Sequence, residues 1–267
     1  MADNLPNDTP DAGHDVERRA RLYGARGIVL RRQDLGEADR ILTLFTAEHG
    51  KRRVVAKGTR RVSSRMAGHL EPFTAVRVLI ARTRGLDIVS QAETISSFSV
   101  LRAHEASIAT AGYLAELVDT FLPDDQANEG AWELLYGALN LLDQQREARL
   151  VTLIFEMGLL RAVGYRPQLD PCIACGEALR PVTNGFSPEG GVVCDTCLPG
   201  RPDALPVGVN ALKLLRAIDR GEIERLFTMR VPAEVWGELS PCLHAYITRV
   251  AGRESRARRV LLELRLE

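Results

Sequence analysis

Four cysteines form two pairs that each have the spacing C-x-x-C. They are Cys172, Cys175, Cys194 and Cys197, and eighteen residues separate the two pairs. Each pair can turn back on itself and offer two thiolates to one ion, so that two pairs complete a tetrahedral sulfur site. A four-sulfur site leaves no position for water, and the spacing therefore predicts one structural Zn²⁺ rather than a catalytic metal. The alternatives are two disulfides or four free thiols.

Glycines flank these cysteines where a tight turn around an ion needs them. Gly176 follows Cys175, and Gly190 and Gly191 precede Cys194. Because glycine has no Cβ, the backbone can turn close to an ion at these positions. The first twenty residues carry five acidic residues and no apolar stretch, so they are not a secretory signal. The sequence therefore favours reduced thiols and a cytoplasmic location over disulfides.

Basic residues concentrate in the N-terminal part of a chain that is neutral overall, with 35 Lys and Arg and 35 Asp and Glu. Residues 21–84 hold fifteen Lys and Arg against five Asp and Glu, whereas residues 100–160 hold three against ten. This asymmetry predicts a polyanion-binding surface on the N-terminal part. The alternative is a solvated basic surface without a ligand. No apolar run reaches about 18 residues, so no membrane span is expected.

The basic residues are densest in residues 51–65, where seven Lys and Arg occur without an acidic residue. Gly, Ser and Thr lie between these charges, which favours an exposed loop that contacts successive phosphates. Phe45, Phe73 and Phe98 are expected in the core, so we expect contacts to the backbone with little reading of bases. The candidate DNA-binding residues are Arg31, Arg32, Lys51, Arg52, Arg53, Lys57, Arg60, Arg61 and Arg65.

The elements that position these residues are short strands followed by helices. Strands are predicted at 27–30, 39–46, 51–57, 72–82 and 86–95, and five strands with turn signals in about 70 residues indicate a small closed barrel. Helices are predicted at 100–122, 132–142 and 150–163, and again at 209–218, 233–250 and 255–264. We expect the helices on both sides of the cysteine segment to pack together. The predicted divisions are a disordered tail at 1–22, the barrel at 23–98, helical parts at 99–167 and 201–267, and a zinc-finger insertion at 168–200.

Two other function classes compete with nucleic-acid binding. Phosphate-cradling GxxxxGK loops and GxSxG elbows are absent from the sequence. A zinc-dependent nucleobase deaminase or hydrolase would use Cys172 and Cys175 as ligands, His69 as a third ligand and Glu71 as general acid and base. That interpretation leaves the second cysteine pair without a role. A third class is a scaffold whose basic barrel binds RNA or an acidic protein.

Several segments resemble the bacterial recombination mediator family RecO. They read GIVLRRQDLGEADRILTLFTAEHGKRRVVAKGTRR at 27–61, LEPF at 70–73, GYRPQLDPCIACG at 164–176 and FSPEGGVVCDTC at 186–197. The resemblance covers most of residues 24–262. It implies an α+β protein with an N-terminal five-stranded OB-fold barrel, an α-helical domain and an inserted four-cysteine zinc finger.

The resemblance also implies a function and partners. RecO proteins bind single- and double-stranded DNA, anneal complementary strands, and relieve the inhibition of RecA loading by single-strand-binding protein (SSB). The expected partners are RecR, in some members RecF, and the C-terminal tail of SSB, and no enzymatic activity is implied. The four cysteines match the family's finger cysteines. The residues that fall in its basic OB segment are Lys51, Arg52, Lys57, Arg60 and Arg61.

The acidic, amphipathic tail of SSB would need an apolar groove bordered by arginines. The C-terminal helices offer Leu243, Ile247 and Val250 for such a groove. The alternative is an ordinary solvated helix face. The arginines of the candidate tail site are Arg249, Arg253, Arg256, Arg258 and Arg259.

Overall fold

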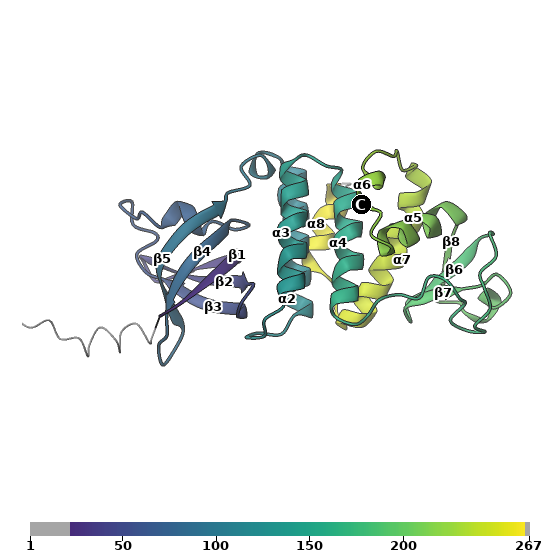
Figure 1. Cartoon of the computed structure of the whole chain (residues 1–267), viewed down its shortest axis with the longest axis horizontal. Coiled ribbons are helices and arrows are strands. Elements are labelled where there is room, and N and C mark those ends of the chain that lie inside the picture. The colour runs from purple at the N-terminus through teal and green to yellow at the C-terminus, as the bar shows by residue number, and fades with distance from the viewer. Residues whose placement is uncertain (1–21, 265–267) are drawn as a thin grey trace, which may run out of the picture.

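The computed structural model describes residues 22–264. Residues 1–21 of the predicted tail at 1–22 lie outside the described residues, whereas Leu22 already belongs to a strand. The molecule is elongated, with the barrel at one end, a helical body in the middle and a small sheet near the other end (Figure 1). Within 22–264, no helix combines the length and the apolar character that crossing a membrane requires.

The N-terminal part is a closed five-stranded barrel in the order β1-β2-β3-β5-β4, as predicted. Neighbouring strands are antiparallel except β3 and β5, which close the barrel through a short parallel pairing at Val54 and Val55. The strands are β1 (Leu22–Leu35), β2 (Asp39–Thr46), β3 (Gly50–Ala56), β4 (Ala75–Ala81) and β5 (Asp87–Ser96).

Strand β1 is much longer than the predicted strand at 27–30. Its pairing with β2 shifts register between Val29 and Arg31, so that Leu30 is an extra residue in a β-bulge. Beyond the bulge, residues 31–35 are all exposed. The apolar alternation that marks a strand in sequence is therefore lost there, although the hydrogen-bonded pairing continues.

Both faces of the barrel wall are buried near the helices. The interior is filled by residues such as Val29, Leu44 and Val54. On the outer face, Ile28 and Phe45 join the core of the helical body. Gly50 is required at this contact, because its φ is +68° and a Cβ there would lie 2.1 Å from the Gln126 carbonyl oxygen.

The helical body combines helices from both sides of the cysteine segment, as predicted. Side chains of Asn128 and Ser255 cap two of the helices by accepting hydrogen bonds from backbone N–H groups. The helix α8 begins against α2, where both carboxylate oxygens of Glu116 accept N–H groups of Arg256 and Ala257. The helices are α2 (Glu105–Phe121), α3 (Glu129–Asp143), α4 (Ala148–Ala162), α5 (Val209–Asp219), α6 (Ile223–Leu226), α7 (Ala233–Ala251) and α8 (Arg256–Glu263). Single 3-10 turns lie at Ala67–Leu70, Leu101–Ala103 and Leu198–Gly200.

The cysteine segment forms a small three-stranded sheet in the order β7-β6-β8, with β6 at Asn184–Ser187, β7 at Gly191–Val193 and β8 at Leu205–Val207. The Phe186 ring packs edge-on against Tyr246 of α7, with 6.1 Å between ring centroids. The Tyr246 hydroxyl donates a hydrogen bond to the Tyr165 carbonyl at 2.8 Å. The cysteine segment is thus joined to the helical core.

Candidate metal centre and nucleic-acid interface

The four cysteine sulfurs converge on one point. All four lie within 4.8 Å of one another, and Cys175 Sγ and Cys194 Sγ are 3.9 Å apart. Cys172 and Cys194 are buried and Cys175 is exposed. This arrangement confirms that the two C-x-x-C pairs, distant in sequence, build a single site that could hold one metal ion.

The backbone around each pair turns toward the sulfurs. Cys172 Sγ accepts N–H groups from Ala174 at 3.4 Å and from Cys194 at 3.3 Å. Gly191 is required for close packing here, because a Cβ would lie 2.4 Å from Ile173 Cγ2 and 2.9 Å from the Gln168 carbonyl oxygen. Such N–H donors support a thiolate and fix its direction.

The environment favours ionisation of Cys172 and opposes ionisation of Cys197. Burial opposes ionisation of Cys172, but N–H groups of Cys194, Cys175 and Ala174 outweigh it and lower its pKa to about 6. Hydrogen bonding with Cys194 and Cys175 raises the pKa of Cys197 to about 12. A dication would displace the remaining protons and bind all four thiolates. The donor set fits a structural metal.

The alternative deaminase site is not assembled. Within 22–264, the cluster that could hold a metal contains only the four cysteines. His69 Nδ1 lies 2.7 Å from Thr94 Oγ1 on the barrel, and Glu71 pairs with Arg32 and Arg40. His69 and Glu71 are therefore engaged in the barrel, away from the sulfurs.

Lys51 has a role different from the predicted one. Its side chain is buried, and its Nζ donates to the Asp119 carbonyl oxygen at 2.8 Å. The same ammonium lies 3.1 Å from an Asp119 carboxylate oxygen and 3.2 Å from Asp124. Lys51 thus fastens the barrel to the end of α2 and is not exposed to a phosphate.

Two further predicted residues turn toward the ends of the barrel. Arg32 pairs with Glu71 at one end. Arg52 lies at the other end, where it pairs with Asp125 at 3.0 Å and stacks over Tyr23. Because β3 runs between these ends, the predicted set does not form one continuous surface.

Other basic residues share the outer face of the sheet. Strand register pairs Arg31 with Thr43 and Thr43 with Arg53, so the three form a row across β1, β2 and β3. Arg53 is exposed, and Arg31 is exposed with a 3.6 Å contact to Asp119. Lys57 is the first residue after β3 and is also exposed.

The loop after β3 is anchored so that its cations stay outside. The Asp39 carboxylate accepts the Gly58 N–H at 2.7 Å, and the buried Thr59 hydroxyl donates to the Ala56 carbonyl at 3.0 Å. Arg60 is held against the β1–β2 turn, where it donates to the Gly36 carbonyl oxygen at 2.6 Å. These contacts hold the backbone of the loop in place and do not involve the side chains of Arg61 and Arg65.

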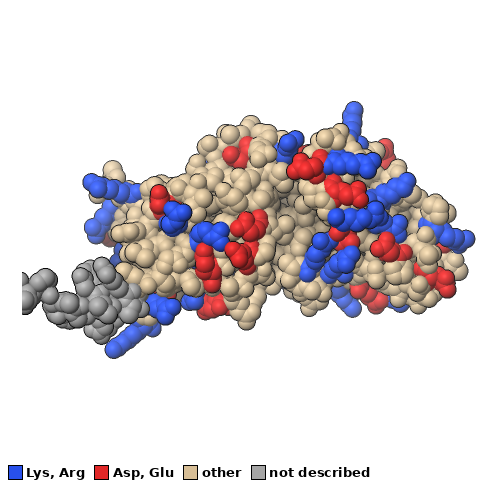
Figure 2. Space-filling model, viewed as in Figure 1, with Lys and Arg blue, Asp and Glu red and all other residues tan. Residues whose placement is uncertain are grey.

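Four cations on this side are free of acidic partners. Within the described part of the chain, no carboxylate lies within ion-pair distance of Arg53, Lys57, Arg61 or Arg65, and all four are exposed. Figure 2 shows Lys and Arg side chains projecting from the barrel end of the molecule. We call Arg31, Arg53, Lys57, Arg61 and Arg65 the barrel basic face.

The hairpin between β4 and β5 carries two cations that the sequence interpretation left out. Arg82 and Arg84 are exposed, and Arg82 lies over the Tyr23 ring at 5.3 Å. In OB-folds the corresponding loop contacts oligonucleotides, so the short connection between the predicted strands at 72–82 and 86–95 was a usable signal. Phe45 and Phe98 are buried, as expected.

The C-terminal arginines are mostly exposed, but the predicted apolar groove beside them is wrong in two positions. Leu243 and Ile247 are core residues with 1% and 4% exposure. The exposed apolar residues of α8 are Val260 and Leu262. Arg258 is buried and donates to the carbonyl and hydroxyl oxygens of Ser240. The exposed arginines are Arg249, Arg253, Arg256 and Arg259.

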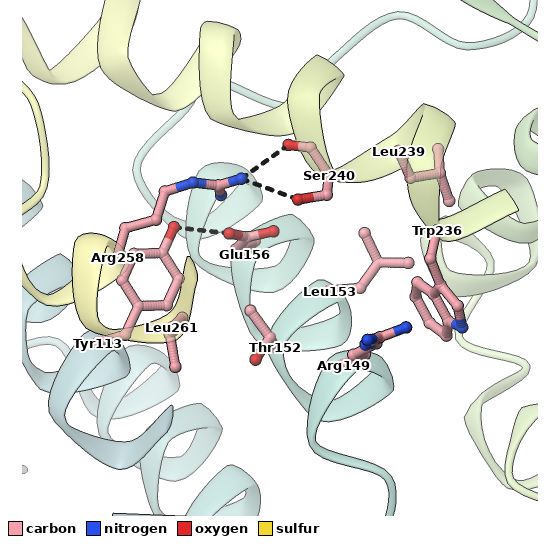
Figure 3. A pocket seen from close by; sticks show the side chains of 10 residues that line it. All are labelled: Tyr113, Arg149, Thr152, Leu153, Glu156, Trp236, Leu239, Ser240, Arg258 and Leu261. Atoms are coloured by element: carbon pink, nitrogen blue, oxygen red, sulfur yellow. Dashed lines mark hydrogen bonds between the residues drawn. The ribbon is translucent and has the colours of Figure 1, made fainter. Parts of the chain in front are cut away.

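A buried polar cluster near Arg258 contains a group with a strongly shifted pKa, as catalytic sites do, but it has no room for a substrate (Figure 3). The Tyr113 hydroxyl donates to Glu156 Oε1 at 2.6 Å, and burial, together with Glu156, raises the pKa of Tyr113 well above its usual value. The adjoining cavity measures about 40 Å³, which admits water but no substrate. The cluster therefore joins α2, α4, α7 and α8 as a structural network.

We expect Lys51→Ala to lower the free energy of unfolding by about 2–3 kcal/mol, because Asp119 loses a buried donor while remaining partly accessible to water. Urea unfolding followed by circular dichroism measures the loss. Lys57→Ala, an exposed change six residues away, should alter stability by less than about 0.5 kcal/mol. Normal stability with weakened DNA binding in Lys51→Ala would assign Lys51 to the DNA interface instead.

Comparisons with known proteins agree on one family. The family model Recombination protein O N terminal matches residues 21–98, and Recombination protein O C terminal matches residues 106–259. The DNA repair protein RecO of Roseiflexus sp. (strain RS-1) is 38% identical over 248 residues, 92% of this chain and 87% of the relative. The DNA repair protein RecO of Dehalococcoides mccartyi (strain ATCC BAA-2266 / KCTC 15142 / 195) is 37% identical over 236 residues, 88% of this chain and 93% of the relative. The matches span both the barrel and the helical body.

Proposed function

This chain belongs to the RecO family of DNA repair proteins, and on that premise we propose that it anneals complementary single strands and helps load RecA onto SSB-coated DNA together with RecR. The observation that carries the proposal is the set of four exposed, unpaired cations on the barrel basic face. Single- and double-stranded DNA are the ligands, and RecF is a further partner. The protein acts in the cytoplasm at the nucleoid, without a bond-breaking step of its own.

Annealing follows from electrostatics. Two single strands repel each other through their phosphates, and cations that neutralise phosphates release counterions and lower this repulsion. Base pairing then supplies the sequence specificity, so the protein need not read bases. The aromatic side chains support this, since Phe45 and Phe98 are in the core and Tyr23 is covered by Arg52 and Arg82.

We assign Zn²⁺ to the four-sulfur site. Cys172, Cys175, Cys194 and Cys197 would hold one ion, and a closed set of thiolates supplies structural stabilisation. The N–H groups of Ala174 and Cys194, which donate to Cys172 Sγ, orient that ligand. The ion is proposed to hold the small sheet against α7 rather than to take part in annealing.

The proposal is tested by annealing SSB-coated complementary oligonucleotides with purified protein and RecR. Wild-type protein should accelerate duplex formation, and a variant with Lys57, Arg60 and Arg61 all changed to Glu should fail to do so. Circular dichroism checks that the variant folds. Equal annealing rates for both proteins would remove Lys57, Arg60 and Arg61 from the mechanism.

The SSB tail is proposed to bind α8, where Arg256 and Arg259 are exposed beside Val260 and Leu262. Arg249 and Arg253 extend the positive charge. We expect Arg256→Ala with Arg259→Ala to weaken binding of a fluorescent tail peptide by about tenfold, measured by anisotropy. A double variant that binds the peptide with unchanged affinity would rule out this site.

A further inference from the structure

Val62 is the most exposed large apolar side chain of residues 22–264. Its relative exposure is 107%, whereas the other exposed large apolar side chains of this part of the chain have exposures of 38–56%. The isopropyl group is therefore left wholly in water, and folding gains nothing from it. A single exposed apolar residue is common on protein surfaces, so its role depends on what surrounds it.

Val62 lies at the tip of a hydrogen-bonded turn in the loop after β3. The Ser64 N–H donates to the Arg61 carbonyl oxygen at 2.9 Å, which places Val62 at a central position of the turn. Just before the turn, the Arg60 N–H donates to the Ala38 carbonyl oxygen at 2.9 Å, between β1 and β2. The tip is thus attached to a backbone that is held on the barrel. A side chain on such a support loses little conformational entropy when it inserts into a partner.

Cations without acidic partners surround this tip. Arg61 precedes Val62, Arg65 follows three residues later, and Lys57 lies at the start of the same loop. All three are exposed, and no ion pair joins them to a carboxylate of residues 22–264. Their charges and the apolar tip together fit a polyanion that also offers flat apolar surface. A single-stranded nucleic acid has both, namely its phosphates and the faces of its bases.

A lipid surface also combines phosphates with apolar groups, but it fits this loop less well. One valine buries much less apolar area than an acyl chain, and even a single acyl chain gives only marginal membrane binding. Insertion between two bases needs only one small apolar group on a rigid support, because the bases close on both sides of it.

We propose that Val62 inserts between neighbouring bases of single-stranded DNA while Arg61 and Arg65 hold the adjoining phosphates. The proposal rests on the DNA-binding function proposed above and adds an apolar contact to it. Insertion of an apolar side chain unstacks two bases, as it does in proteins that kink duplex DNA. Because every base has an apolar face, the contact requires no particular sequence. The interrupted stack makes the strand locally flexible, so that it adjusts to a complementary strand during annealing.

The test places 2-aminopurine, whose fluorescence is quenched by stacking, in the middle of an oligodeoxyadenylate. At saturation, the full wild-type chain should raise this fluorescence by about twofold or more. Val62→Ser should abolish most of the rise and weaken affinity by about threefold, because the apolar contact is lost. The slope of log K against log salt should stay the same, since every phosphate contact remains.

Two further variants serve as controls. Val62→Leu should keep the rise in fluorescence, because it keeps an apolar side chain at the tip. Val182→Ser makes the same chemical change at an exposed valine of the cysteine segment and should behave like the wild-type protein. Since the Val62 side chain is wholly in water, Val62→Ser should unfold at the wild-type temperature, and a calorimetric scan checks this.

No rise in fluorescence with the wild-type protein, or an equal rise with Val62→Ser, would overturn the proposal. An equal rise combined with slower annealing of Val62→Ser only when RecR is present would assign Val62 to a protein contact, and would equally overturn it. Failure of this proposal alone leaves normal annealing and a normal salt slope. Failure of the proposed function removes annealing by the wild-type protein itself, so the two failures are distinguishable.

Discussion

Cys172→Ser is expected to remove the metal ion and to unfold the small sheet of the cysteine segment. Cys172 is the most buried of the four sulfurs and accepts two backbone N–H groups, so a hydroxyl cannot replace it as a ligand. Apparent binding energies of structural zinc reach about 10 kcal/mol or more. If only ~4 kcal/mol of this stabilises the whole chain, Tm should fall by about 10 °C.

Metal content and calorimetry measure these two effects. Limited proteolysis should locate the damage between residues 168 and 207, since loss of the sheet also frees Phe186 from Tyr246. Cys242→Ser is the matched control, because Cys242 is a buried thiol of α7 outside the sulfur cluster. It should keep one ion per chain. A Cys172→Ser protein that still binds one zinc ion would show that the ligand set is wrong.

The four-sulfur cluster could be predicted because the sequence signal for each of its halves is local. Each C-x-x-C pair specifies its own turn. Gly176 marks a backbone position with a φ of +77°, and Gly191 marks where the backbone must come close to its neighbours. Strand β2 was predicted with its observed bounds, since an apolar strand between turns is also a local signal. To predict that the two cysteine pairs come together, it was enough to assume that four thiolates share one ion.

Which basic side chains of the barrel are exposed to solvent could not be predicted, because exposure depends on what covers each part of the barrel. The alternation of side chains along a strand correctly places Lys51 and Arg53 on one face of β3 and Arg52 on the other. It does not reveal that the helical body covers the outer face at Lys51 and leaves it open at Arg53. That difference is set by Asp119 and Asp124, which lie about 70 residues away in sequence. The β-bulge near Arg31 is a further feature without a sequence signal.

The prediction of an apolar groove beside the C-terminal arginines was wrong for a different reason. Leu243 and Ile247 are four residues apart and lie on the apolar stripe of α7, which is the side that a helix turns toward the core. The same periodicity therefore argues against a free groove there.

Changing Lys57, Arg61 and Arg65 together to Glu should have the largest effect on DNA binding. Each cation that neutralises a phosphate of a single strand contributes about 0.7 to the slope of log K against log salt, so the slope should fall in magnitude by about 2. Affinity for an oligothymidylate at moderate salt should drop by about a hundredfold or more. Fluorescence anisotropy over a series of salt concentrations measures both quantities.

Three basic residues of the helical body, Lys213, Arg225 and Arg230, supply a control with the same change of charge. Lys213→Glu, Arg225→Glu and Arg230→Glu together should leave the salt slope unchanged. These residues lie in or directly after α5 and α6, which are on the other side of α2, α3 and α4 from the barrel (Figure 1). A small decrease in association rate is expected from the altered overall charge. The barrel basic face is the DNA interface only if the two triple variants differ. Equal slopes in both would mean that binding responds to net charge rather than to the arrangement of cations on β1, β3 and the loop after β3.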